Sequence, residues 1–188
     1  MSRSLWDSTA SELLQRASSG DPTPGGGAIA AVAAAFGVAL VRMALEVTIS
    51  SADGDKGDLG RLADAQARAR ELQAGFVEAA DRDVAEFEAL MAGYRMPRGT
   101  DDQRRARRHA IDEATVTATR GPLDLAEAAG GGLALADEVA PLVKRTIVSD
   151  VQAGRDLLRA AALAALRTAE INLAALEESG HPAAAALR

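Results

Sequence analysis

An almost uninterrupted apolar segment, residues 28–45, constrains the fold of this chain more than any other feature, and Arg42 is its one charged residue. Alanine supplies much of the segment and is the strongest helix former. Residues 21–27, which read Asp-Pro-Thr-Pro-Gly-Gly-Gly, come directly before it. Glycine lets another group approach the backbone closely, and the free N–H groups of a helix start can bind an anion or a polar ligand edge. The junction therefore predicts a long buried helix whose first turn either packs against another helix or borders a ligand.

The composition favours helices over sheets. Hydrophobic residues make up 48% of the chain but aromatic residues only 3%, and no segment alternates steadily between apolar and polar residues. Alanine-rich, aromatic-poor cores suit closely packed helices. A chain of 188 residues is long enough for one domain with a core of its own. We therefore expect an all-α bundle of about five to seven helices in a single domain, residues 1–188.

Turn residues and helix caps divide the chain into expected helices. Thr9 with Glu12 and Thr100 with Gln103 have the spacing of capping boxes. Pro122 suggests a helix restart. The first expected helix carries Leu13 and Leu14 inward, the second spans residues 28–49, and the third begins after Gly60 and ends at Pro97. The fourth spans residues 100–120 and continues from Pro122 to a Gly-Gly-Gly connector at 130–132. A short helix interrupted at Pro141 follows, and the last helix spans residues 149–177.

Residue content and charge exclude several functions. The chain has no cysteine, which excludes disulfides, thiolate metal sites and a cysteine nucleophile. Two histidines, His109 and His181, leave little for a histidine metal site or a triad. A net charge of −6 and a pI near 5.0 argue against nonspecific nucleic-acid binding. We expect no metal, no cofactor and no nucleic-acid partner.

Two segments bear on membranes and targeting. Residues 1–15 lack the basic start and apolar block of a signal peptide. Residues 28–45 are slightly short for a bilayer span and are richer in alanine and glycine than in leucine or isoleucine. The expectation is a buried core helix in a soluble, cytoplasmic protein without a membrane partner.

Four polar residues lie on helix faces that otherwise read as apolar. Asp83 follows Phe76 by seven residues and precedes Phe87 by four, and Asn172 lies between Ile171 and Leu173. A buried charge or amide needs a partner, a proton or a function. Asp150 has the alternative role of a helix cap, and Glu46 that of a surface ion pair with Arg42. Together the four outline a polar pocket inside an alanine-rich bundle.

Several short motifs, in order along the chain, resemble those of the cyclodeaminase/cyclohydrolase family. This family contains bacterial methenyltetrahydrofolate cyclohydrolases and the deaminase domain of formiminotransferase-cyclodeaminase. The resemblance extends from about Leu13 to Leu176. The motifs are Pro24-Gly25-Gly26-Gly27-Ala28, Asp83-Val84-Ala85-Glu86-Phe87, Tyr94-Arg95-Met96-Pro97, Gly121-Pro122-Leu123 with Leu125-Ala126-Glu127, Ser149-Asp150-Val151, and Glu170-Ile171-Asn172-Leu173.

The resemblance implies an all-α homodimer with active sites near the subunit interface. Its chemistry is the making or breaking of a C–N bond at a carbon held between nitrogens in a folate ring system. Carried over residue by residue, the working carboxylates are Asp83 and Asp150. The substrate would be bound by Pro24, Gly25, Gly26, Gly27, Phe87, Ser149 and Asn172.

The chain departs from the family pattern on one side of this predicted site. Glu46 stands where the family usually has asparagine, and the segment Asp53-Gly54-Asp55 stands where lysines commonly follow. Val143-Lys144 replaces a Gly-Asn pair, and Ile147 takes the place of a cysteine found in some members. Folates carry glutamate carboxylates, so these changes favour a cationic substrate over a polyanionic one.

The leading hypothesis from the sequence is therefore an iminium cyclase that acts on a small cationic amine, as in bacterial alkaloid biosynthesis. In it, Glu46, Asp83 and Asp150 stabilise the cation and one of them moves the proton. The first alternative is a methenyltetrahydrofolate cyclohydrolase or formiminotetrahydrofolate cyclodeaminase, with a tetrahydrofolate derivative as substrate. Its basic groups would then come from elsewhere, such as the arginines at 104, 105, 107 and 108. The second alternative is a non-catalytic dimeric helical module in which Glu46 pairs with Lys144.

Overall fold

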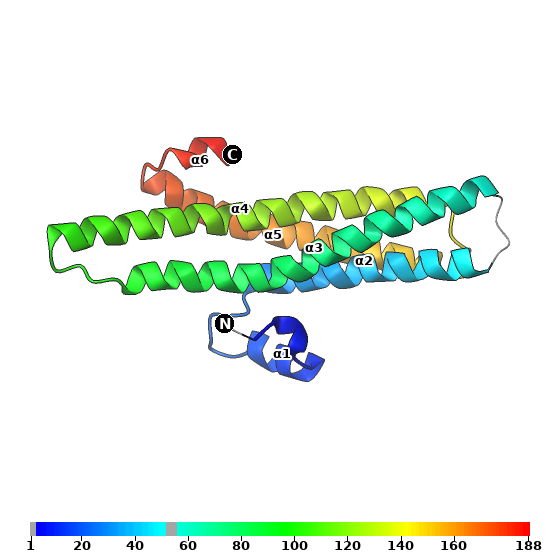
Figure 1. Cartoon of the computed structure of the whole chain (residues 1–188), viewed down its shortest axis with the longest axis horizontal. Helices are drawn as coiled ribbons and strands as arrows, with labels where there is room; N and C mark the ends of the chain where they lie inside the picture. Colours follow the sequence, from blue (N-terminus) through cyan, green and yellow to red (C-terminus); the bar gives the residue numbers. More distant parts are fainter. Residues whose placement is uncertain (1–2, 52–55) are drawn as a thin grey trace. The chain divides into compact units, whose positions relative to one another are not determined.

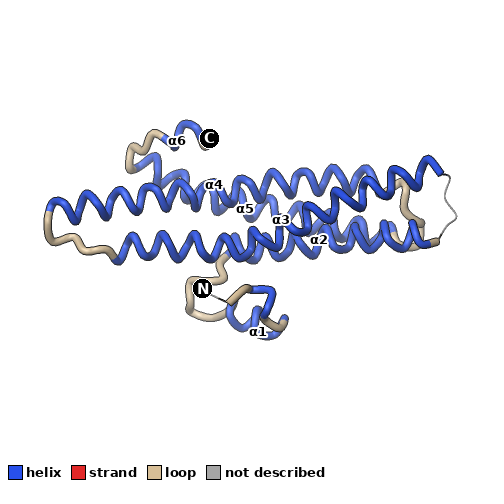
Figure 2. The backbone as a smooth tube through the Cα atoms, viewed as in Figure 1, coloured by secondary structure: helices blue, strands red, loops and turns tan. Residues whose placement is uncertain are grey.

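The structure is a computed structural model and describes residues 3–51 and 56–188. Six α-helices and one short 3₁₀ helix make up the described part, which contains no strand (Figures 1 and 2). The prediction of an all-α bundle of five to seven helices is confirmed. In chain order the elements are η1 (Leu5–Asp7), α1 (Ala10–Ala17), α2 (Gly26–Ser50), α3 (Lys56–Arg95), α4 (Asp101–Val139), α5 (Val148–Glu178) and α6 (Ala183–Ala186).

The contacts within the chain divide it into two compact units. Unit 1 contains Met1–Ile29, Ala79–Asp124 and Ala164–Arg188, and unit 2 contains Ala30–Glu78 and Leu125–Leu163. The helices α2, α3, α4 and α5 each contribute residues to both units. The single domain expected from the sequence remains a prediction.

Unit 2 has an alanine-rich core built around α2. Ala31, Ala34, Val38 and Val41 are completely buried, and Phe76 of α3 is 1% exposed. By length and composition α2 is able to cross a membrane, but 61% of its most apolar window is buried inside the protein. The burial expected for this helix is therefore confirmed, since packing accounts for most of its apolar surface.

Two glycines bring α2 and α5 together within unit 2. A Cβ added to Gly37 would lie 2.7 Å from the carbonyl oxygen of Gly154, and one added to Gly154 would meet the carbonyl oxygen of Gly37. Real Cβ atoms do not approach backbone oxygens so closely, so only glycine permits this contact.

Unit 1 ties the start of the chain to α3. The Asp81 carboxylate accepts hydrogen bonds from the Ser4 hydroxyl at 2.6 Å and from the Leu5 N–H at 2.8 Å. The predicted capping box at Thr9 and Glu12 forms at the start of α1. The expectation that α1 turns Leu14 inward is wrong, because this side chain is 71% exposed.

The structure corrects the expected breaks in the second half of the chain. α4 continues from Asp101 to Val139 through Pro122 and through Gly130, Gly131 and Gly132, so neither the restart nor the glycine connector exists. Gly132 has a packing role instead, since a Cβ there would lie 2.9 Å from Leu158 Cδ2. Tertiary packing therefore holds this glycine-rich stretch helical against its low intrinsic propensity.

Candidate active site

A cavity in unit 1, here called the Asp83 cavity, is lined by six of the ten predicted site residues. Its volume is about 200 Å³. The loop before α2, the first turn of α2, and the helices α3, α4 and α5 line this cavity. The lining residues are Pro22, Thr23, Gly25, Gly26, Gly27, Asp83, Glu86, Phe87, Ala118, Thr168 and Asn172.

Asp83 lies directly against the N-terminal turn of α2. A Cβ added to Gly27 would overlap the Asp83 carboxylate and lie 2.8 Å from its Cγ, so Gly27 makes room for this side chain. Burial raises the pKa of Asp83, and a hydrogen bond from the Ala28 N–H opposes that rise. The N-terminus of a helix favours a negative charge. The Ala28 N–H, one of the helix-start groups that the sequence predicted could bind an anion, therefore binds a carboxylate of the protein itself.

Glu86 lies one helical turn beyond Asp83 and was not among the site residues predicted from the sequence. Its side chain is 13% exposed, and Arg82 Nε lies 3.8 Å from its Oε1. Burial raises the pKa of Glu86 to about 7, Arg82 lowers it, and the nearby Asp83 and Asp124 carboxylates raise it further. A carboxyl group with a pKa near neutrality suits proton transfer at physiological pH.

A glycine on α4 accommodates Glu86 as Gly27 accommodates Asp83. A Cβ added to Gly121 would lie 2.5 Å from Glu86 Oε2. The signal that could have identified Glu86 was its position three residues after Asp83, which places both carboxyl groups on one face of α3.

Asn172 reaches the cavity from α5. Its Nδ2 donates a hydrogen bond to the Ala118 carbonyl oxygen at 2.7 Å, which gives this half-buried amide the partner that a buried amide was expected to need. The lining also includes Phe87 and the predicted loop glycines Gly25, Gly26 and Gly27.

Four of the ten predicted site residues, namely Pro24, Glu46, Ser149 and Asp150, do not line this cavity. Pro24 is buried beside the loop but does not line the cavity. Three of the four belong to unit 2: Glu46 in the second half of α2, and Ser149 and Asp150 at the start of α5. The structure therefore brings Asp83 together with Gly25, Gly26, Gly27, Phe87 and Asn172, and does not place the other four in the lining.

Glu46 has a side-chain partner on α3, and Asp150 lies in the first turn of α5. Glu46 is exposed on α2, and its Oε2 accepts a hydrogen bond from Gln66 Nε2 of α3 at 3.0 Å. No ion pair joins it to Arg42 or to Lys144 among the residues that the structure describes; Arg42 Nη1 instead donates to Gln73 Oε1. Asp150 is in the first turn of α5, and its N–H donates to the Ile147 carbonyl at 3.1 Å.

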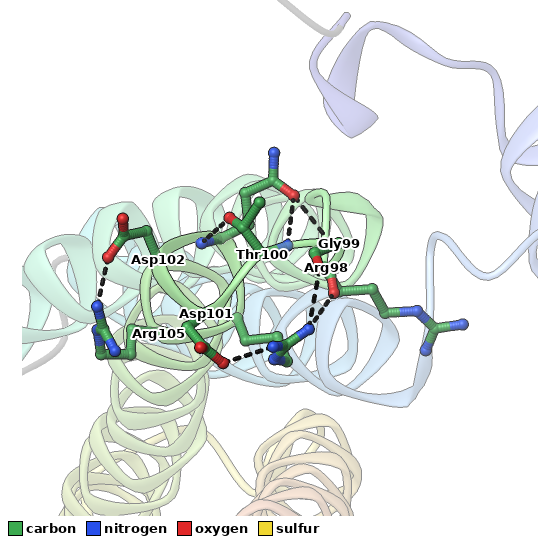
Figure 3. Close-up of polar contacts among 8 residues, drawn as sticks. Arg98, Gly99, Thr100, Asp101, Asp102 and Arg105 are labelled. Carbon is green, nitrogen blue, oxygen red and sulfur yellow. Dashed lines mark hydrogen bonds and ion pairs between the residues drawn. The ribbon is translucent and has the colours of Figure 1, made fainter.

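The arginines near the start of α4 are held by their neighbours (Figure 3). Arg104 pairs with Asp101 at 2.5 Å, and Arg105 pairs with Asp102. Arg107 donates to the Tyr94 carbonyl at 3.2 Å and lies over the Tyr94 ring. None of these arginines lines the Asp83 cavity. Figure 3 also shows the predicted cap, in which the Thr100 hydroxyl accepts from the Gln103 N–H.

The charge of the cavity follows from its lining. Both ionisable residues among the described lining residues are carboxylic acids, and none is basic. Such a cavity suits a cationic or N–H-bearing group and can hold or move a proton. Within the described residues, no group of three or more His, Asp or Glu is placed to hold a metal ion.

A family model described as formiminotransferase-cyclodeaminase matches residues 9–185. The chain belongs to this family. It is 35% identical over 167 residues to a methenyltetrahydrofolate cyclohydrolase of Methylorubrum extorquens, an alignment that covers 88% of this chain and 77% of that protein. It is 28% identical over 173 residues to the formimidoyltransferase-cyclodeaminase of Rattus norvegicus, covering 91% of this chain and 31% of the rat protein.

The fold also has a solved counterpart. The crystal structure of a formiminotetrahydrofolate cyclodeaminase from Thermotoga maritima superimposes with a TM-score of 0.77 at 21% identity, over 89% of this chain and 79% of that one. The family resemblance, the all-α fold and the prediction of a cyclodeaminase/cyclohydrolase-family enzyme that acts on C–N bonds are confirmed. The segment Asp53-Gly54-Asp55, on which the cationic-substrate hypothesis partly rested, lies outside the described residues.

Proposed function

We propose that this chain is a methenyltetrahydrofolate cyclohydrolase, which was the first alternative from the sequence. The observation that carries the proposal is the pair of carboxyl groups in the Asp83 cavity, with the pKa of Asp83 raised and that of Glu86 raised to about 7. The Methylorubrum extorquens relative, which aligns over most of both chains, supports the choice of substrate.

Glu86 is the proposed general base and Asp83 the proposed electrostatic group. The methenyl carbon lies between two nitrogens and shares their positive charge, which an ionised Asp83 would stabilise. Glu86 would take a proton from the attacking water as the C–O bond forms. The same proton would pass to the departing nitrogen as the C–N bond breaks, and the second water proton would leave as the formyl C=O forms.

The size of the cavity limits what it encloses. Typical ligand pockets have volumes of about 300–1,000 Å³, whereas the Asp83 cavity has about 200 Å³. It would therefore take the reacting ring of the substrate, while the remainder of a folate would extend outside it.

A formiminotetrahydrofolate cyclodeaminase is the second candidate. The rat and mouse formimidoyltransferase-cyclodeaminases, each 28% identical over 173 residues, favour it. The same two carboxyl groups could protonate a departing ammonia. The products separate the candidates, because only the cyclodeaminase releases ammonia.

The iminium-cyclase hypothesis has no support from the comparisons. Its distinguishing residue, Glu46, is exposed, accepts a hydrogen bond from Gln66 and does not line the Asp83 cavity. The non-catalytic alternative required an ion pair between Glu46 and Lys144 and no cavity beside Asp83. The described residues meet neither condition.

A homodimer forms part of the proposal. On α2 of unit 2, Phe36 is 59% exposed, Met43 38% and Val47 41%, and their spacing of seven and four places them on one stripe of the helix. Exposed apolar stripes commonly mark protein interfaces. Light scattering after size exclusion should give twice the chain mass of 19.4 kDa; a monomer at micromolar concentration would contradict this part.

The functional test is the loss of methenyltetrahydrofolate absorbance above the buffer rate. We expect turnover by the wild-type protein and at least about a 100-fold loss in Asp83→Asn, of the order seen when one electrostatic group is removed from an active site. Glu88→Gln, which changes an exposed carboxylate on the same helix, is the matched control and should keep wild-type activity. Circular dichroism checks folding. A folded wild-type protein without turnover would overturn the proposal, and ammonia release from the formimino substrate would favour the second candidate.

A further inference from the structure

Pro122 leaves a backbone acceptor free at the wall of the Asp83 cavity. It lies inside α4, where a proline has no N–H to donate to the carbonyl four residues earlier. That carbonyl belongs to Ala118, which lines the cavity. Proline is also the least favourable residue in a helix interior, so its presence here asks for a compensating interaction.

Asn172 supplies that interaction. Its Nδ2 donates to the Ala118 carbonyl oxygen at 2.7 Å, and both residues line the cavity. A carbonyl oxygen only accepts hydrogen bonds, so the contacting atom must be the NH₂ group and the orientation of the amide is determined. The amide oxygen, Oδ1, is therefore on the opposite side from Ala118. It is not among the buried side-chain atoms that lack a partner in the described residues, which are Arg42 Nε and Gln66 Oε1.

We propose that Pro122 is a positioning residue that fixes the Asn172 amide so that Oδ1 serves as a hydrogen-bond acceptor for the substrate. The group it would accept from is an N–H, or the positively polarised C–H, of the ring that enters the Asp83 cavity. This inference rests on the proposed function for its substrate, but the orientation of the amide does not.

The arrangement favours ligands with a donor at this point. If residue 122 had an N–H, that N–H would donate to the same Ala118 carbonyl oxygen and weaken its bond to the Asn172 amide, which would then be held less firmly in one orientation. An amide that rotates presents donor and acceptor alternately, and it loses discrimination between ligands with and without the matching donor.

The first experiment reads the amide directly. Asn172 is the single asparagine of the chain, so asparagine labelled with ¹⁵N in its side chain gives one NH₂ pair in an NMR spectrum. We expect one of the two protons to exchange slowly with water in the wild-type protein and this protection to fall at least about 10-fold in Pro122→Ala, as when one hydrogen bond is lost. An unchanged pair in Pro122→Ala would overturn the proposal, whatever the activity of the protein.

The second experiment is a double-mutant cycle of Pro122→Ala and Asn172→Ala, assayed as kcat/KM on methenyltetrahydrofolate. Each single variant should lose about 10-fold, the effect of one misplaced hydrogen bond. Because Pro122 acts through Asn172, adding Pro122→Ala to Asn172→Ala should cause no further loss. Pro141→Ala, a proline replacement in the exposed turn after α4, should retain wild-type kcat/KM.

The outcomes of the cycle separate positioning from stability. We expect the melting temperature of Pro122→Ala to be unchanged or higher, because a helix interior prefers alanine. Losses that multiply in the double variant would show that Pro122 acts independently of Asn172, and would overturn the proposal. If the wild-type protein has no turnover, the proposed function fails, and the NMR result alone decides the orientation of the amide.

Discussion

Gly27 and Gly121 have the same relation to the two carboxyl groups of the candidate site. A Cβ at Gly27 would overlap the Asp83 carboxylate, and a Cβ at Gly121 would lie 2.5 Å from Glu86 Oε2. Neither glycine has a positive φ; among the glycines that the structure describes, Gly180 alone does. These two glycines are therefore needed for space rather than for backbone conformation.

Gly27→Ala should push Asp83 away from the N-terminus of α2. We expect at least about a 10-fold loss of kcat/KM, as for one displaced charged hydrogen-bonding group. Steady-state kinetics on methenyltetrahydrofolate measures the loss. Gly130→Ala is the matched control, because nothing lies within 4 Å of a Cβ there. Equal activity of Gly27→Ala and wild-type protein would contradict the placement of Asp83.

Glu86 should lower the stability of the protein at neutral and alkaline pH. Its pKa is about 7 in the folded protein against an ordinary value of 4.5. The folded state therefore holds the proton more tightly than the unfolded state, and stability falls as the pH rises from about 4.5 to 7. At pH 8 we expect the free energy of unfolding of Glu86→Gln to be about 1–3 kcal/mol higher than that of the wild-type protein.

Urea denaturation at two pH values measures this difference. The gain should vanish below about pH 3.5, where Glu86 is protonated in both states. A Glu86→Gln variant that is less stable than wild type at pH 8 would contradict the raised pKa of Glu86.

At the scale of the helices, α4 differs most from its expected form. Pro122 and the three glycines at 130–132 predict breaks, yet the helix continues to Val139. Asn172 satisfies the carbonyl that Pro122 leaves free, and Gly132 fits against Leu158. Both compensations come from α5, distant in sequence, so a local pattern could not reveal them.

The close contact of α2 with α5 gives a stability prediction in unit 2. Gly154→Ala would drive a methyl group against the Gly37 carbonyl and Val41 Cγ2, and it should lower the free energy of unfolding by about 1–3 kcal/mol. Gly130→Ala, on the exposed side of α4, should raise it by up to about 1 kcal/mol. Chemical denaturation of both variants tests this. Similar changes in the two variants would contradict a close backbone contact.

The sequence predicted the helical class, the two capping boxes and the roles of the loop glycines as a cavity border. Asp83 and Asn172 were selected because polar residues on apolar stripes are visible without a structure, and Phe87 was selected from the family resemblance. Glu86 was missed because its surroundings on α3 include exposed residues, and its close approach to Gly121 of α4 is visible only in the structure. The iminium-cyclase hypothesis relied on the presence of Glu46 in place of the family's asparagine, but the Glu46 side chain is exposed and does not line the cavity.

At the scale of the molecule, the residues that line the Asp83 cavity all belong to unit 1. Four helices, α2 to α5, have residues in both units, so unfolding one unit would leave only part of each of these helices in the other. Helix formation is cooperative along its length. The two units should therefore unfold together, as the predicted single domain requires.

The one tryptophan offers a test of this cooperativity. Trp6 is in unit 1, so its fluorescence follows that unit, whereas far-UV circular dichroism follows every helix. We expect the two thermal transitions to coincide. A fluorescence midpoint several degrees below the circular dichroism midpoint would indicate two independently unfolding domains.

The pH dependence of kcat/KM for methenyltetrahydrofolate hydrolysis, measured for wild type and Glu86→Gln, tests the central claim most directly. A general base with a pKa of about 7 must be ionised to act, so wild-type kcat/KM should fall tenfold per pH unit below about pH 7 after subtraction of the buffer rate. Glu86→Gln should lose most of the activity together with this acidic limb. A folded Glu86→Gln variant that keeps both the rate and the limb would contradict the assignment of Glu86 as the base.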